Sequence, residues 1–127
     1  MNEQTGLLMA KAERAILAAQ HLDDQGDIEF SIGRAYYAMF FVAEALLNEK
    51  GYHFTKYGGV HKAFGEYYVK TGLFEEQYHR WLLTAYNRRI MSDYGVEVVF
   101  TREEARELIW QAQQFHKAAR TYIQSKS

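Results

Sequence analysis

The chain contains no proline in 127 residues. Proline breaks helices because it lacks a backbone N–H and its ring clashes with the preceding turn, so a chain without it can form long helices. The abundant alanine, leucine, glutamate, lysine, glutamine and arginine also have the highest helix propensities. Apolar residues recur every three or four positions along most of the sequence, which is the spacing of amphipathic helices. The sequence therefore predicts an all-α protein of four or five helices.

Capping residues set the expected helix boundaries. Asp27 can cap the second helix, and Gly51 stands where a left-handed residue often ends a helix. Thr101 followed by Glu104 is a capping box for the last helix. The predicted helices are 3–22, 27–50, 60–70, 74–94 and 101–124, and the predicted connections include a glycine-containing loop, 51–59, and the segment 96–100.

The second helix is apolar on nearly all sides between residues 35 and 47. Such a helix is expected to be buried on several sides at once. Because four or five short helices provide limited cover, one side is predicted to face a second subunit, with Ala35, Ala38 and Ala45 permitting close approach. We therefore expect a homodimer. The apolar run is interrupted by Glu44 and is too short to cross a bilayer, so no membrane association is expected.

Composition limits the function classes. The length fits a single domain spanning residues 1–127. The absence of cysteine excludes disulfides and a thiolate nucleophile and fits a reducing compartment. Charged residues within 1–20 interrupt the apolar core that a signal peptide needs, so we expect a cytoplasmic protein. With 15 basic and 16 acidic residues, no overall positive field favours nucleic acid, and any such contact is expected to be local.

The five histidines do not have the spacing of a metal site. His53 and His61 flank the glycine-containing loop, and the other three lie on separate predicted helices. No pair has the i,i+4 spacing of a helical metal site, so we predict no metal and no cofactor. His116 lies on the apolar stripe of the last helix; it is either a hydrogen-bonded core residue, the favoured interpretation, or a group that approaches Arg89.

Five sequence elements follow one another in a set order along nearly the whole chain. They are Gly-Arg-Ala-Tyr-Tyr-Ala-Met-Phe at 33–40, Ala-Leu-Leu at 45–47, Gly-Val-His at 59–61, Arg-Ile-Met-Ser-Asp-Tyr at 89–94, and Ala112 with Phe115 on the last helix. In this order they resemble the HEPN domain family. The resemblance implies an antiparallel, up-and-down helical bundle that is usually dimeric. It also implies pairing with a minimal nucleotidyltransferase in a toxin–antitoxin module, and for several members metal-independent ribonuclease activity.

The chain departs from the ribonuclease members of the family at one position. Those members carry an arginine, then four to six intervening residues, then a histidine. Arg88 and Arg89 match the arginine, but residues 92–96 are Ser, Asp, Tyr, Gly and Val. Asp93 could replace the missing base only if burial raised its pKa towards neutrality, whereas an arginine one turn away lowers the pKa. Arg89 and Asp93 are therefore candidates for catalysis but suit binding better, and an i,i+4 ion pair is the structural alternative.

Arg34 and Tyr37 lie one turn apart on the second helix. They could contact a phosphate, or Arg34 could bridge to Asp93 on the fourth helix as a structural ion pair. Tyr94 could stack on a base or pack in the core.

The leading prediction is a binding module for a nucleotide or a nucleotidyltransferase-type partner. Single-stranded RNA is a further candidate ligand. The alternatives are a metal-independent ribonuclease toxin that uses Arg89 with a base other than histidine, and a structural helical adaptor. The predicted binding residues are Arg34, Tyr37, Arg88, Arg89, Asp93 and Tyr94.

Overall fold

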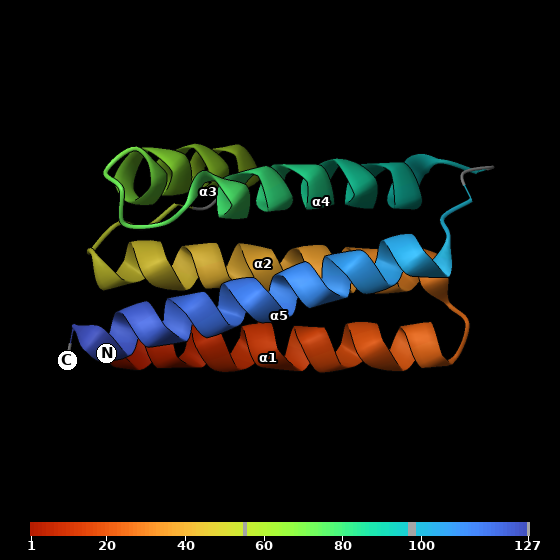
Figure 1. Ribbon diagram of the computed structural model, residues 1–127, viewed down its shortest axis with the longest axis horizontal. Helices are drawn as coiled ribbons and strands as arrows, with labels where there is room; N and C mark the ends of the chain where they lie inside the picture. Colours follow the sequence, from red (N-terminus) through yellow and green to blue (C-terminus); the bar gives the residue numbers. More distant parts are fainter. Residues whose placement is uncertain (55, 97–98, 127) are drawn as a thin grey trace.

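The computed structural model describes residues 1–127 except 55, 97–98 and 127. Consecutive long helices alternate in direction, and the two chain termini lie at the same end of the molecule (Figure 1). The described residues contain no strand. The predicted all-α, antiparallel bundle is therefore confirmed. Its elements are α1 (Glu3–Asp24), α2 (Ile28–Glu49), α3 (Tyr57–Phe64), the π-helical turn η1 (Gly65–Val69), α4 (Glu76–Tyr94) and α5 (Arg102–Ser125).

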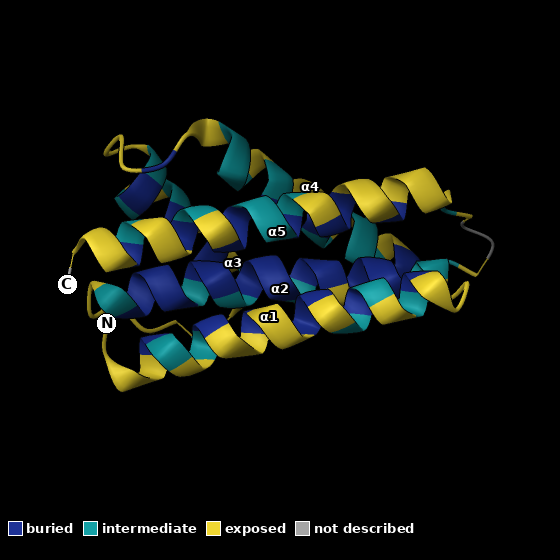
Figure 2. Ribbon diagram, turned by 60° about the horizontal axis from the view of Figure 1, so that its bottom comes forward, coloured by how far each residue is buried: buried dark blue, intermediate teal, exposed yellow. Residues whose placement is uncertain are grey.

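Helix α2 is the central helix of the bundle. It packs against α1, α3, α4 and α5, and it is the most extensively buried helix (Figure 2). The prediction that several of its sides are buried is confirmed. The prediction that Ala35, Ala38 and Ala45 face a second subunit is wrong, because all three are 0 % exposed within the single chain. Their small side chains instead allow the neighbouring helices of the same chain to approach α2.

Helix α2 is also long and apolar enough to cross a membrane by length and composition. The sequence argument considered only its apolar middle, whereas the whole helix is 22 residues long. In the structure, 67 % of its most apolar window is buried inside the protein, as in the core helix of a bundle.

The helix boundaries follow the predicted caps at most ends. Gly51 has a φ of 84°, the left-handed conformation expected after α2, and the Thr101 hydroxyl accepts a hydrogen bond from the Glu104 N–H at 3.1 Å. Asp27 occupies the N-cap position of α2, but its side chain makes no capping hydrogen bond because its backbone is not in the extended conformation of a cap.

The third predicted helix, 60–70, differs from the observed one. Helix α3 begins earlier, at Tyr57, so the predicted loop 51–59 extends too far. The helix then widens into the π-helical turn at Gly65. A Cβ at Gly65 would lie 2.9 Å from the His79 ring, so the absence of a side chain lets α4 approach this turn closely. The predicted connection 96–100 lies partly outside the described residues.

The buried carboxylate of Asp23 at the end of α1 binds two arginines at the start of α5. Asp23 is 5 % exposed, and its carboxylate accepts a hydrogen bond from Arg106 Nε at 2.9 Å and lies 3.3 Å from Arg102 Nε. Arg102 also donates to the Asp23 carbonyl at 3.0 Å. These contacts join segments that are about 80 residues apart in sequence.

Asp23→Ala is expected to lower the free energy of unfolding by about 1 to 3 kcal/mol, because it removes charge-assisted hydrogen bonds from a buried acceptor. Chemical denaturation monitored by circular dichroism measures the change. Asp24→Ala, which alters the exposed neighbour, is the matched control and should change the free energy by less than about 0.5 kcal/mol. Equal stability of the two variants would show that the contacts of Asp23 with Arg102 and Arg106 contribute nothing to the free energy of unfolding.

Candidate functional site

The guanidinium of Arg89 on α4 is surrounded by tyrosine rings from α2 and α3. Its Cζ lies 5.0 Å from the ring centroid of Tyr57, 5.2 Å from that of Tyr37 and 5.8 Å from that of Tyr36. Tyr36 and Tyr37 are adjacent on α2, and Tyr57 is the first residue of α3. The electron-rich faces of these rings attract the cation and hold it in place. We call Arg89, Tyr36, Tyr37, Tyr57 and Asp93 the arginine–tyrosine cluster.

Asp93 forms the predicted i,i+4 ion pair with Arg89. Arg89 Nε donates to Asp93 Oδ2 at 3.1 Å, and the exposed fractions of the two side chains are 12 % and 41 %. Among the hydrogen bonds of the described residues, Arg89 uses only this nitrogen, and neither of its terminal amino groups has a partner there. An arginine with free terminal nitrogens can bind a phosphate or carboxylate through two parallel hydrogen bonds.

The cluster keeps Arg89 charged. Burial by itself lowers the pKa of Arg89, but Tyr37, Tyr57, Asp93 and Tyr36 outweigh it, and the net effect is a raised pKa. A permanent cation held against aromatic rings is suited to binding anions.

The hydroxyls of Tyr36 and Tyr37 are neutral at physiological pH. Burial raises the pKa of Tyr36, and burial together with a hydrogen bond to Tyr57 raises the pKa of Tyr37. The Tyr37 and Tyr57 hydroxyls are 3.0 Å apart. Tyr36 and Tyr37 can donate hydrogen bonds to a ligand, but their raised pKa values make them poorly suited to act as general bases at neutral pH.

Arg34 joins this cluster through Tyr37 and not through Asp93. Its Cζ lies 4.7 Å from the Tyr37 ring centroid, so Tyr37 contacts two guanidinium groups. The alternative of an Arg34–Asp93 bridge between α2 and α4 is wrong for the described structure, because Asp93 pairs with Arg89 on its own helix. Arg34 is exposed, which leaves its charge accessible to solvent.

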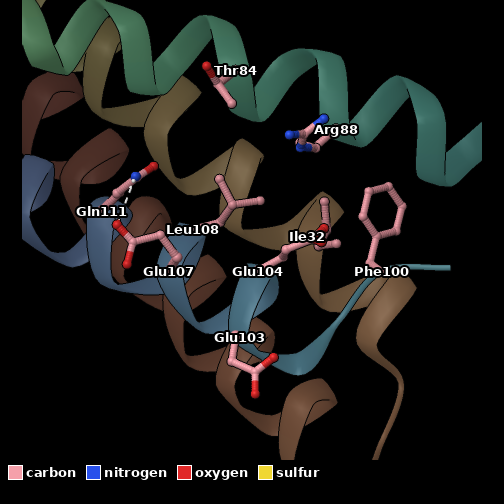
Figure 3. A pocket seen from close by; sticks show the side chains of 9 residues that line it. All are labelled: Ile32, Thr84, Arg88, Phe100, Glu103, Glu104, Glu107, Leu108 and Gln111. Carbon is pink, nitrogen blue, oxygen red and sulfur yellow. Dashed lines mark hydrogen bonds between the residues drawn. The ribbon is translucent and has the colours of Figure 1, made fainter.

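Two predicted binding residues lie away from the cluster. Arg88 projects into a groove between α4 and α5 (Figure 3), because adjacent residues on a helix point about 100° apart. Tyr94, the last residue of α4, is 75 % exposed. The structure thus brings together four of the six predicted binding residues: Arg34, Tyr37, Arg89 and Asp93.

Two of the histidines are neighbours, since His79 Nε2 lies 3.0 Å from the His61 carbonyl oxygen, whereas His116 lies in the core on α5. His116 is buried, and its Nε2 is 3.0 Å from the Met9 carbonyl, so it is a hydrogen-bonded core residue, as the favoured interpretation had it. Within the described part of the chain, no three His, Asp or Glu side chains are placed to hold a metal ion.

Comparison with known proteins identifies the family. The sequence matches the HEPN domain over residues 5–122. The chain belongs to the HEPN domain family. Two proteins of Methanocaldococcus jannaschii that are named as candidate toxins are 31 % and 37 % identical to it, over 94 % and 91 % of this chain and 82 % and 85 % of theirs. A UPF0332 protein of Thermotoga maritima is 30 % identical over 98 % of this chain and 96 % of that protein.

This HEPN domain has a histidine beside the cluster, although none follows Arg89 at the spacing of the ribonuclease motif. His61 on α3 is 5 % exposed, and its Nε2 lies 2.7 Å from the Tyr36 hydroxyl. Tyr86 on α4 packs against the other side of the imidazole, with the ring centroids 4.9 Å apart. Burial is the larger cause and the nearby His79 the smaller one, and together they lower the pKa of His61 to about 4. His61 is thus a neutral, buried support for Tyr36 and is not positioned as a replacement base.

Sequence reasoning missed three members of this HEPN site: Tyr36, Tyr57 and His61. Tyr36 stood out only as part of a family motif, His61 only as part of a motif and as a histidine that flanks the glycine-containing loop, and Tyr57 was assigned to that loop. Their shared role depends on the packing of α3 against both α2 and α4, which no local pattern reveals. The one available signal was the density of tyrosine near Arg34 and the glycine-containing loop.

Proposed function

We propose that this chain is a toxin-like HEPN protein that acts as a binding module for phosphate-bearing ligands, either a nucleotide or single-stranded RNA. The toxin-like character is supported by family membership and by the names of the Methanocaldococcus jannaschii relatives. The observation that carries the binding proposal is the guanidinium of Arg89, which lies against three tyrosine rings and whose terminal nitrogens form no hydrogen bond among the described residues.

Two cations share one aromatic ring in this proposed site. Arg34 and Arg89 both lie within about 5 Å of the Tyr37 centroid, and Asp93 neutralises only one of them. The cluster therefore carries a local positive charge on a chain with a formal net charge of −1. Such a local charge favours phosphate groups through charge-assisted hydrogen bonds, and its effect weakens with salt.

The test uses a matched pair of adjacent arginines. Arg89→Ala is expected to weaken binding of a fluorescent single-stranded RNA or ATP analogue at least about tenfold, because it removes a charged, pre-positioned donor. Arg88→Ala removes the same charge from the neighbouring position, which faces the groove between α4 and α5. This variant should change the affinity less than about threefold. Fluorescence anisotropy at low salt in the presence of a chelator measures both. Equal losses would show that the cluster is not the binding site.

The same incubations distinguish the ribonuclease alternative. The RNA from these incubations is analysed on a gel. If the wild type cleaves RNA in the presence of chelator and Arg89→Ala does not, the protein is a metal-independent ribonuclease and the binding proposal is wrong. The raised tyrosine pKa values and the buried position of His61 favour binding over proton transfer. A purely structural role would appear as loss of stability in Arg89→Ala with no ligand bound by the wild type.

The proposed partners are a second copy of the chain and a nucleotidyltransferase-type protein. Neighbouring helices cover most sides of α2, and the one side that faces solvent is available for contacts with a partner. On this face Phe30 is 61 % exposed, Arg34 is exposed and Phe41 is partly buried. Tyr37 lies on the same face, so a partner bound there would also border the arginine–tyrosine cluster.

Tyr37→Leu is expected to weaken RNA or nucleotide binding by about three- to tenfold, because both guanidinium groups lose a cation–π contact. Anisotropy titration measures the loss. Tyr52→Leu, which changes a tyrosine stacked on Tyr67 instead, should bind as the wild type does. An unchanged affinity of Tyr37→Leu would mean that the ring does not position the arginines.

A further inference from the structure

A groove of about 390 Å³ separates α4 from α5 near the start of α5 (Figure 3). Thr84 and Arg88 border it from α4, and Ile32 of α2 contributes to its lining. Its volume falls at the lower end of the range for ligand-binding pockets, about 300 to 1,000 Å³, which suits a few side chains. The remaining lining residues are Phe100, Glu103, Glu104, Glu107, Leu108 and Gln111.

The charged residues of this groove are unbalanced. Glu103, Glu104 and Glu107 contribute three carboxylates, and Arg88 contributes one guanidinium, which contacts the Met91 sulfur at 3.9 Å. None of the three glutamates forms an ion pair among the residues that the structure describes. Glu103 and Glu104 lie in the first turn of α5, where acidic residues stabilise the helix, but Glu107 lies beyond that turn.

An unsatisfied hydrogen-bond acceptor lies beside Glu107. Gln111 donates through Nε2 to Glu107 Oε1 at 3.2 Å, and its own Oε1 is buried with no hydrogen-bond partner in the part of the chain that the structure describes. A buried acceptor without a partner is unfavourable, so a donor from a ligand would stabilise it. Figure 3 shows Gln111 and Glu107 side by side on α5, with Thr84 and Arg88 projecting from α4.

The groove also has an apolar floor. Ile32 is 0 % and Leu108 is 5 % exposed, and Phe100 is partly buried at one end. Acceptors along one side and apolar carbon on the floor match a ligand that has both a cationic donor and an aliphatic part. Arginine and lysine side chains next to a leucine-type residue have this combination.

We propose that the α4–α5 groove binds a basic, amphipathic segment of a partner protein. An arginine or lysine side chain lies against Glu104, Glu107 and the Gln111 carbonyl oxygen, and an adjacent apolar side chain packs on the floor. The complementary charge favours this partner over an acidic one. The groove is separate from the arginine–tyrosine cluster, so this inference does not depend on the proposed anion binding.

The test uses N-acetyl-Leu-Arg-Leu-amide as the probe and the full chain as the receptor. Two-dimensional ¹H–¹⁵N NMR is expected to show saturable shifts at Thr84, Leu108 and Gln111, with a dissociation constant in the millimolar range typical of so small a ligand. N-acetyl-Leu-Glu-Leu-amide should leave these resonances unchanged. Absence of saturable shifts with the arginine peptide, or equal shifts with both peptides, would overturn the proposal.

Charge-matched variants locate the site. The double variant Glu104→Gln with Glu107→Gln is expected to weaken peptide binding at least about fivefold, because the groove loses two carboxylates. Glu66→Gln with Glu76→Gln removes the same charge from exposed positions elsewhere and should bind as the wild type does. Equal losses in the two double variants would show general electrostatic attraction and overturn the groove as the site.

A second substitution and a second probe complete the test. Thr84→Trp is expected to fill the groove and abolish peptide binding without a change of charge, while circular dichroism confirms the fold. Spermidine carries positive charge without a leucine-type side chain and should bind more weakly than the peptide. Binding of spermidine as tight as that of the peptide would assign the groove to small polyamines and overturn the protein-segment proposal.

Discussion

Replacing Phe115 with alanine is expected to lower the free energy of unfolding by about 3 to 5 kcal/mol. Phe115 on α5 is fully buried, and its ring centroid lies 5.2 Å from that of Phe64 on α3 and 5.5 Å from that of Tyr78 on α4. The truncation would leave a cavity where three helices meet, and the surrounding rings cannot collapse fully into it. Urea denaturation monitored by circular dichroism measures the loss.

Leu17→Ala is the matched control for Phe115→Ala. Leu17 is an apolar helical residue that is 58 % exposed, so its truncation should change the free energy of unfolding by less than about 0.5 kcal/mol. If Phe115→Ala lost no more than this control, the described packing of α3, α4 and α5 around Phe115 would be wrong.

Acidification is expected to destabilise the protein through His61. Burial lowers the pKa of this imidazole to about 4, whereas the unfolded chain has the ordinary histidine pKa of about 6.5. Because the folded-state pKa is the lower one, the unfolded state binds more protons between these values. The stabilisation is therefore complete above about pH 6.5 and is lost as the pH falls towards 4. The slope from this one group approaches about 1.4 kcal/mol per pH unit.

The free energy of unfolding at pH 7.5 and at pH 5.0 tests this expectation. The wild type should lose about 2 kcal/mol from His61 over this interval. His61→Gln has no group to protonate at this position, so its loss between the two pH values should be smaller by that amount. His53→Gln, which changes an exposed histidine, is the matched control for the substitution itself. Equal pH dependence of the wild type and His61→Gln would contradict the neutral, buried state of His61.

Part of the candidate site could be predicted from local spacing. Arg89 and Asp93 lie one turn apart on α4, so helix geometry alone brings them together, and the ion pair at 3.1 Å agrees with that prediction. Arg34 and Tyr37 likewise follow from their spacing on α2. Arg88 was grouped with Arg89 because the two are adjacent in sequence, but a helix directs adjacent residues to different faces.

The rest of the site depends on contacts between helices. Tyr57 and His61 reach the cluster only because α3 packs against both α2 and α4. Packing within the single chain likewise leaves Ala35, Ala38 and Ala45 fully buried. The apolar pattern of α2 indicated burial on several sides but contained no information on which helix covers each side.

The sequence by itself determined the helical class, the approximate extent of each helix, the capping at Gly51 and Thr101, and the family. These features depend on interactions between residues a few positions apart, which repeat with the period of the helix. Only the tertiary structure decided which helices surround α2, that Arg89 lies among three tyrosines, and that Arg88 faces a separate groove. These arrangements come from the close packing of side chains that are distant in sequence, where shape and volume select one arrangement among many with the same hydrophobic pattern.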